Sequence, residues 1–180
     1  MKPKILVFSL YLTGLLTTAP SCTEDTEPDL FPFSENYTLT LENLSFYADH
    51  GRYNQVNSKR EDGSLCLLDF DVLRVQRNQN ILAIHIAKPV GCAVKYELVW
   101  DGTLMESFPM RANIFVRALG ENCGSSDLET EVLQVDLEKT FKTLSPAEID
   151  STIFNVRDAC SQQDFYCKEN CDLTVSTESN

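Results

Sequence analysis

The chain has 180 residues, of which 27 are acidic and 15 are basic, and 43% of them are hydrophobic. This length fits one domain of ordinary size and is too short for a multidomain enzyme. The hydrophobic content excludes a disordered chain, and the formal net charge of −12 excludes nucleic acid as a partner, because phosphate contacts need clustered lysine and arginine.

Residues 1–21 have the pattern of a secretory signal peptide. A basic start at residues 1–4 precedes an uncharged, mostly apolar run at residues 5–16, and small residues lead from there into Cys22. The run is too short to cross a bilayer as a helix, which takes about twenty apolar residues. The sequence therefore predicts export, with no transmembrane helix left after cleavage.

The residues before Cys22 also bear on what happens to that cysteine. Ala19-Pro20-Ser21-Cys22 resembles the lipobox of bacterial lipoproteins, and the resemblance implies that Cys22 becomes the acylated first residue. Cleavage after Ser21 by an ordinary signal peptidase is the alternative. Removing Cys22 from the seven cysteines leaves an even number, which suits disulfides in an oxidising compartment. We expect lipidation of Cys22, and hence a membrane as one partner of the chain.

Residues 22–35 are acidic and contain proline, so we expect a solvated tether. A cysteine followed at once by an acidic string resembles the surface-export signal of Bacteroidetes-type lipoproteins. The stretch from Gly91 to Cys123 is also similar to small lipoproteins of flavobacterial type. These resemblances imply an outer-membrane or cell-surface location, and they imply no activity and no cofactor.

Residues 36–172 show the alternation of apolar and polar residues that is typical of β-strands. Alternating stretches begin at Tyr37, Leu68, Leu82, Val94 and Leu133, and further β-rich stretches cover residues 112–119 and 152–156. Turn-forming residues separate them at residues 78–80, 88–91, 101–102, 108–109 and 120–126. This spacing predicts an all-β fold, a single antiparallel β-sandwich-like domain, with residues 173–180 as a C-terminal tail.

Helical features are few. Residues 50–63 are polar, and we expect a long loop there. Ser145-Pro146-Ala147-Glu148 combines an N-cap serine, a proline at the first helical position and a glutamate that completes a capping box. Because β-branched Thr152 and Ile153 follow, this helix is expected to be about one turn long.

Six cysteines remain as disulfide candidates, namely Cys66, Cys92, Cys123, Cys160, Cys167 and Cys171. A hairpin that turns at Ser107-Phe108 places Trp100 opposite Phe115 and Cys92 opposite Cys123, which predicts a disulfide between these two cysteines. A turn at Asp101-Gly102 is the alternative, and it breaks this register.

The other four cysteines suggest a second set of bonds. Three of them, Cys160, Cys167 and Cys171, lie close together near the C-terminus. We predict one local pair among these three and a bond from the third to Cys66. The chain has no C-x-x-C motif, so we expect neither a zinc site nor another cofactor.

Candidate site residues are scattered along the sequence. Tyr47 and Tyr53 flank the polar segment, and Asp69 and Asp71 would face one side of a strand, as paired carboxylates in a sugar-cleaving or calcium site would. A solvated surface is the competing interpretation. His85 is expected to be a half-buried structural residue, and His50 to lie in a turn after Asp49. Trp100, Tyr96 and Phe115 would form either a ligand platform or part of the core.

The chain contains none of the common catalytic motifs, including G-x-S-x-G, H-E-x-x-H and the P-loop. We therefore expect no catalytic residues, and a non-catalytic binding or structural module of the cell envelope with a protein or glycan partner. One alternative is a lipocalin-like binder of a small apolar ligand. A weaker alternative is an extracellular hydrolase.

Overall fold

The computed structural model describes residues 35–60, 64–66, 68, 70–121, 123–167 and 172–174. The predicted signal peptide, the predicted lipidation site Cys22 and nearly all of the predicted tether lie outside the described residues. So do Asp69 and Cys171.

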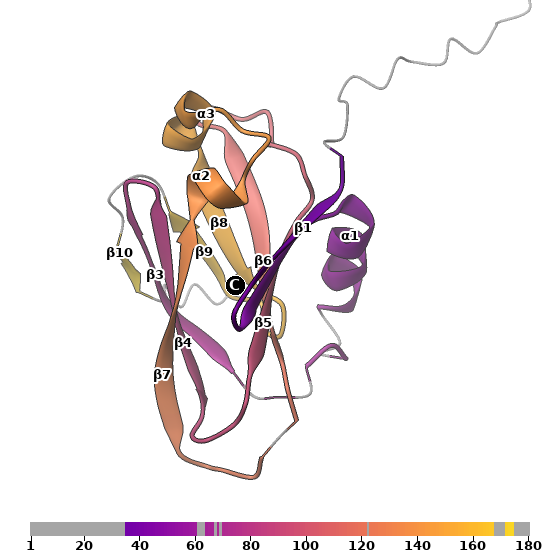
Figure 1. The fold of residues 1–180 in the computed structure, drawn as a ribbon, viewed down its shortest axis with the longest axis vertical. Helices are drawn as coiled ribbons and strands as arrows, with labels where there is room; N and C mark the ends of the chain where they lie inside the picture. The colour runs from indigo at the N-terminus through magenta and orange to yellow at the C-terminus, as the bar shows by residue number, and fades with distance from the viewer. Residues whose placement is uncertain are drawn as a thin grey trace, which may run out of the picture. The chain divides into compact units, whose positions relative to one another are not determined.

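The described chain folds as two β-sheets that pack face to face around one core (Figure 1). In spatial order, the larger sheet consists of β1 (Tyr37–Leu41), β2 (Leu44–Ala48), β5 (Lys95–Trp100), β6 (Arg111–Leu119), β8 (Ile153–Asp158) and β9 (Asp164–Cys167). The smaller sheet consists of β10 (Asp172–Thr174), β3 (Asp71–Asn78), β4 (Ile81–Pro89) and β7 (Leu128–Asp136). The prediction of an all-β, sandwich-like fold is confirmed.

The strand pairing is mixed and not purely antiparallel. Strand β2 pairs with β5 in parallel, as β6 does with β8, while the other pairs are antiparallel. Parallel neighbours need a long connection. Here β3 and β4 lie between β2 and β5 in the chain, and β7 lies between β6 and β8. In each parallel pair, the chain therefore passes through the smaller sheet between the first strand and the second.

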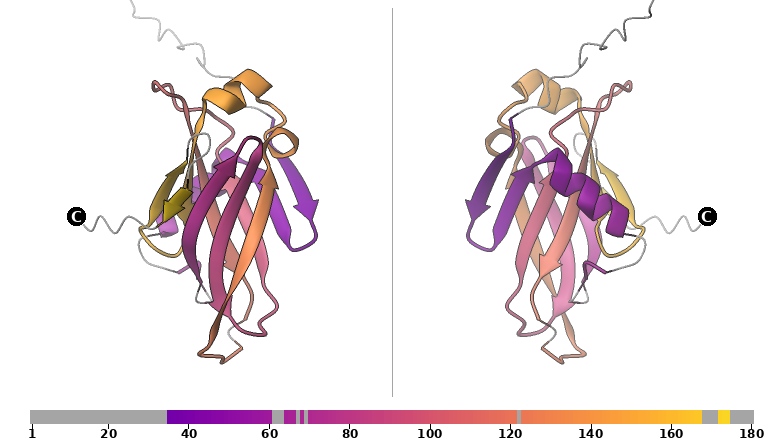
Figure 2. Two further views of the ribbon diagram at one scale, coloured as in Figure 1. Left: turned by 90° about the vertical axis from the view of Figure 1, so that its left-hand side faces the viewer. Right: turned by 90° about the vertical axis from the view of Figure 1, so that its right-hand side faces the viewer.

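Helix α1 (His50–Lys59) occupies the segment that the sequence predicts as a loop. The Asp49 side chain accepts a hydrogen bond from the Arg52 backbone N–H at 2.9 Å, which makes Asp49 an N-cap and not a turn residue. Tyr53 and Val56, three positions apart, are the buried residues of the helix. They hold it against the outer face of the larger sheet (Figure 2, right). The other residues of α1 are mostly exposed to solvent.

Two shorter helices follow β7, namely α2 (Leu137–Thr140) and α3 (Pro146–Ser151). The predicted capping box at α3 is present. The Glu148 carboxylate accepts a hydrogen bond from the Ser145 N–H at 2.7 Å, and the Ser145 hydroxyl accepts one from the Glu148 N–H at 3.3 Å. With α1 and α2 added, the described chain has more helix than the single turn that the sequence predicts.

Aromatic rings fill the space between the sheets. Phe141, in the segment after α2, lies 5.1 Å from Phe46, 5.0 Å from Trp100 and 5.1 Å from Phe154, measured between ring centroids. All four side chains are almost completely buried. Burial of each ring stabilises the fold by about 1.5–3 kcal/mol. The centre of the sandwich is therefore a packed core.

The β5–β6 hairpin is shifted by one residue from the predicted register. Trp100 pairs with Ile114, and Phe115 pairs with Val99, so Trp100 faces the core while Phe115 faces α1. Trp100 and Phe115 therefore lie on opposite faces of the sheet and form no common platform. The shift arises in the loop of residues 101–110, where Met105 bridges to Arg111 and neither proposed tight turn forms.

Two disulfides join distant parts of the chain. The predicted bond between Cys92 and Cys123 is present, with a Cα–Cα distance of 5.7 Å. Both cysteines lie beyond the paired strands, where irregular backbone absorbs the one-residue shift. Cys66 is bonded to Cys160, with a Cα–Cα distance of 5.6 Å, so Cys160 is the C-terminal cysteine that ties to Cys66. The predicted local pair involves Cys171, outside the described residues. Disulfides of this kind are typical of an oxidising compartment.

Candidate functional site: a lateral groove

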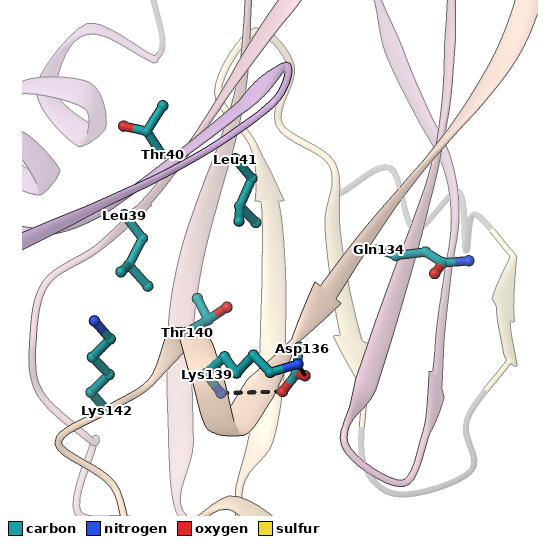
Figure 3. A pocket seen from close by; sticks show the side chains of 8 residues that line it. All are labelled: Leu39, Thr40, Leu41, Gln134, Asp136, Lys139, Thr140 and Lys142. Carbon is teal, nitrogen blue, oxygen red and sulfur yellow. Dashed lines mark hydrogen bonds and ion pairs between the residues drawn. The ribbon is translucent and has the colours of Figure 1, made fainter.

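A groove with a volume of about 490 Å³ opens along one side of the sandwich, between the edge strands β1 and β7 (Figure 3). The residues that line it come from β1, from β7 and from the segment around α2. They are Leu39, Thr40, Leu41, Gln134, Asp136, Lys139, Thr140 and Lys142.

The apolar wall of the groove follows from the alternation along β1. Tyr37, Leu39 and Leu41 point to the same side of the strand. Leu39 packs partly against the core, whereas Leu41 is 51% exposed. The smaller sheet ends at β7, so it leaves these leucines less covered than the apolar residues of β2. The result is a hydrocarbon surface that is reachable from solvent.

Tyr37 links β1 to the last residue of α2, which lines the groove. Its hydroxyl donates a hydrogen bond to the Thr140 backbone oxygen at 2.7 Å. Partial burial raises the pKa of Tyr37 above its ordinary value, so the hydroxyl keeps its proton at neutral pH and remains a donor. This bond fixes the start of β1 against the segment that follows β7.

The charged groups of the groove differ in how they are paired. Asp136 forms an ion pair of 2.7 Å with Lys139, and this hydrogen-bonded partner lowers the pKa of Asp136. Lys142 forms no ion pair with any residue that the structure describes. Its side chain extends toward Leu39 in Figure 3. The groove thus offers an apolar wall and one cation with no anionic partner in the described part of the chain, which suits a ligand with a hydrocarbon part and an acidic group.

The residues predicted as a ligand site do not form one cleft. Tyr47 on β2 and Tyr53 on α1 belong to the cluster between α1 and the larger sheet, where the Arg52 guanidinium lies 3.7 Å above the Tyr47 ring and Tyr53 is only 8% exposed. Asp71 begins β3 in the other sheet and lines a separate pocket of about 240 Å³. Asp69 lies outside the described residues. The tyrosines therefore belong to the packing of α1 and are not joined by Asp71.

Both histidines contact the side-chain amide of a neighbouring residue. His85 lies on the face of β4 opposite its core residues, half-buried, and its Nε2 is 3.0 Å from the Gln76 Oε1. His50 is the first residue of α1, and its Nε2 is 2.9 Å from the Asn54 side-chain nitrogen. Each of these two contacts is with a side-chain amide and not with a carboxylate.

The sequence gives no indication of the arginine network between α1 and the larger sheet. Arg52 and Arg117 both contact Glu97, which is 5% exposed, and Arg157 lies 3.3 Å from Asp164. These charges come from positions far apart in the chain, so no local motif marks them. Because each is paired with another charge of the network, they hold α1 in place and do not form an open site.

Comparison of the chain with protein-family models, with curated proteins and with solved structures finds no match. Within the described ranges, no three His, Cys, Asp or Glu side chains are grouped to hold a metal ion. Among the helices described, none has the length and apolar character needed to span a membrane. A function for this chain therefore has to come from the geometry and chemistry of the groove.

Proposed function

We propose that this chain is an exported, lipid-anchored protein of the cell envelope that acts as a non-catalytic module and binds a small amphiphile in the lateral groove. The observation that carries the binding role is the solvent-accessible apolar wall of Leu39 and Leu41 beside Lys142. The disulfides and the resemblance of residues 19–22 to a lipobox support export and anchoring.

The size and the lining of the groove favour a ligand with an acyl chain. Small-molecule sites usually measure about 300–1,000 Å³ and are mostly apolar with a few polar groups that fix orientation. Each methylene buried on the leucine wall would contribute about 0.8 kcal/mol. The Lys142 ammonium would hold an acidic head group. A fatty acid, or another amphiphile with a carboxylate or phosphate, combines these features.

The charges of the groove support binding over hydrolysis. A hydrolase that uses paired carboxylates needs two of them on either side of the scissile bond. Asp136 is the carboxylate of this groove, and its ion pair with Lys139 lowers its pKa, which keeps it from acting as a general acid. The alternative of an extracellular hydrolase therefore has little support here.

A lipocalin-like internal site has less support than the lateral groove. Such a site needs a closed barrel around a cavity. The described strands form two separate sheets, and Trp100, Phe141 and Phe154 occupy the space between them. An apolar ligand of this protein would therefore bind at the side of the sandwich.

Titration with a fluorescent fatty acid, cis-parinaric acid, tests the binding role. We expect saturable binding to the wild type. In Leu41→Asp the affinity should fall roughly tenfold or more, because a buried leucine contact is worth about 1.5–3 kcal/mol. Lys142→Glu should weaken binding of the acid but not of the matching alcohol. The control is Leu73→Asp, which changes a leucine of similar exposure on β3, outside the groove. Equal binding by Leu41→Asp and Leu73→Asp would refute the groove as the site.

Mass analysis of the mature N-terminus tests the anchoring separately. We expect an acylated Cys22 as the first residue, and release of Cys22→Ser from the membrane fraction. An N-terminus at Met1, or a mature Cys22 without acyl groups, would contradict the anchoring while leaving the binding experiment interpretable.

A further inference from the structure

The loop of residues 101–110, between β5 and β6, exposes apolar side chains to solvent. Phe108 is 106% exposed, so its ring makes almost no contact with the rest of the protein, and Met105 is 48% exposed. Leu104 packs partly against the core, and Pro109 and Met110 are partly exposed. Because the two exposed side chains, Phe108 and Met105, lie on one loop and are not scattered singly, they indicate a surface that another phase or molecule covers.

Internal hydrogen bonds satisfy several polar groups of this loop. The Met105 N–H donates to the Arg111 backbone oxygen at 2.8 Å, and the Ser107 N–H donates to the Met105 oxygen at 2.8 Å. The Ser107 hydroxyl donates to the Pro109 oxygen at 2.7 Å. Backbone groups that are already bonded cost less to remove from water than free ones. The tip can therefore enter an apolar layer without leaving these groups unpaired.

The loop lies at the end of the larger sheet where the described chain begins. Tyr37, the first residue of β1, pairs with Ala48, and Ala48 pairs with Trp100, which directly precedes the loop. Met110 accepts a hydrogen bond from the Ile153 N–H just after α3. In Figure 1 the start of β1 and α3 are at the same end of the sandwich. A chain attached through residues before β1 is thus attached at the end that carries Phe108.

The length of the segment before the first described residue limits how far this end can move from the anchor. Residues 22–34 number thirteen, and thirteen residues can span no more than about 45 Å. The nine residues of β4 alone extend about 30 Å. With Cys22 in the bilayer, the end that carries Phe108 therefore stays within reach of the lipid surface, while the opposite end can stay clear of it.

We propose that Phe108 and Met105 insert into the interfacial layer of the bilayer that holds the acylated Cys22, and that this second contact sets the orientation of the domain on the membrane. The inference rests on the proposed anchoring. Interfacial side chains of this kind reach about 5–10 Å into the boundary between head groups and acyl chains. Glu106, next to the tip and exposed, stays at the level of the head groups.

Quenching by brominated phospholipid tests the contact directly. All described elements belong to one compact unit, which does not include residues 1–32. The chain from residue 22, with a polyhistidine tag at its N-terminus, can therefore be attached to zwitterionic vesicles that contain a nickel-chelating lipid. The variants are Phe108→Trp and, at the opposite end, Val90→Trp, which replaces a residue that is 43% exposed. The native Trp100 is fully buried and provides the background emission.

We expect brominated lipid to remove most of the added emission of Phe108→Trp, and to leave Val90→Trp and the wild type unchanged. Equal quenching of the two variants would overturn the proposal, because the domain would then have no fixed orientation. Quenching of neither would also overturn it and would point to a protein that covers the loop. Because the tag imposes the attachment, these results do not depend on whether Cys22 is acylated in cells.

Discussion

Arg77 is a charged residue whose side chain is completely buried. Its Nη1 donates to the Thr152 backbone oxygen and its Nη2 to the Ile149 oxygen, both at 3.0 Å, while its Nε donates to the Gln79 oxygen at 2.9 Å. The last carbonyl groups of a helix lack partners within the helix. The planar guanidinium of Arg77 donates hydrogen bonds to carbonyl groups at the end of α3, so this one side chain links α3 to β3.

We expect Arg77→Leu to lower the free energy of unfolding by about 2–4 kcal/mol, because it removes the guanidinium donor from the buried Thr152 oxygen and leaves the Ile149 oxygen with the Thr152 N–H alone. Urea unfolding followed by circular dichroism measures the change. The control is Lys59→Leu in the last turn of α1, an exposed position where the effect should stay within about 0.5 kcal/mol. Equal stability of the two variants would show that water or a shifted backbone replaces the guanidinium.

Asp158 gives a pH dependence of stability. The side chain is completely buried, its Oδ1 accepts a hydrogen bond from the Cys160 N–H at 2.7 Å, and its Oδ2 has no hydrogen-bond partner among the described residues. Burial raises the pKa of Asp158 above 3.8. Between the pKa of the unfolded chain and the higher pKa of the folded state, the folded protein keeps a proton on Asp158 that the unfolded chain has released. The stability that protonated Asp158 provides is therefore present at low pH and is lost as the pH rises through the folded-state pKa.

The variant Asp158→Asn removes this titration. We expect the stability of the wild type relative to Asp158→Asn to fall as the pH rises above about 4 and to become constant once the pH exceeds the folded-state pKa. Urea unfolding of both proteins at each pH gives the difference in their free energies of unfolding. Glu129, Asp136 and Glu148, whose pKa values are lowered, affect both proteins equally, so their effects on stability cancel in this difference. A difference that does not change with pH would contradict a raised pKa at this position.

At the scale of elements, the success of sequence-based prediction depends on how local the determining interactions are. The alternation in residues 82–86 and the capping box at Ser145 are local patterns, and both elements form as predicted. Helix α1 has only Tyr53 and Val56 as buried residues, too few for a helical period to appear among polar neighbours. The groove depends on where the smaller sheet ends, which no pattern around Leu39 or Leu41 reveals.

The two disulfides close chain segments of different length, and this difference predicts their relative contributions. Cys92 and Cys123 are 31 residues apart, whereas Cys66 and Cys160 are 94 apart. In the chain-entropy model these bonds stabilise the fold by about 3.7 and about 4.7 kcal/mol. We expect the double alanine variant of the Cys66–Cys160 pair to lose more stability than that of the Cys92–Cys123 pair. Guanidinium unfolding ranks them, and the reverse order would show that local strain dominates.

For the molecule as a whole, a ligand in the lateral groove would connect the free edges of the two sheets. Leu39 and Leu41 belong to the larger sheet, and Gln134 and Asp136 belong to the smaller one. Within the described chain, the bonds that already cross this side include the one from Tyr37 to Thr140 and the one from the Asn43 amide to the Glu131 carboxylate, at 2.6 Å. A bound amphiphile would therefore add to an existing but sparse set of links between the sheets.

We expect a fatty acid at about 100 times its dissociation constant to raise the free energy of unfolding by about 2.7 kcal/mol, because it binds only the folded state. For a chain of this size, the melting temperature should rise by roughly 5–10 °C. Hydrogen exchange through local opening should slow in β1 and β7, whereas in β3, which lies away from the groove, only amides that exchange through global unfolding should slow. Leu41→Asp is the control, since a tenfold lower affinity should cut the stabilisation at the same fatty acid concentration to about 1.4 kcal/mol and roughly halve the rise in melting temperature. Protection centred on β3 would locate the ligand on the smaller sheet and contradict a site between the two edges.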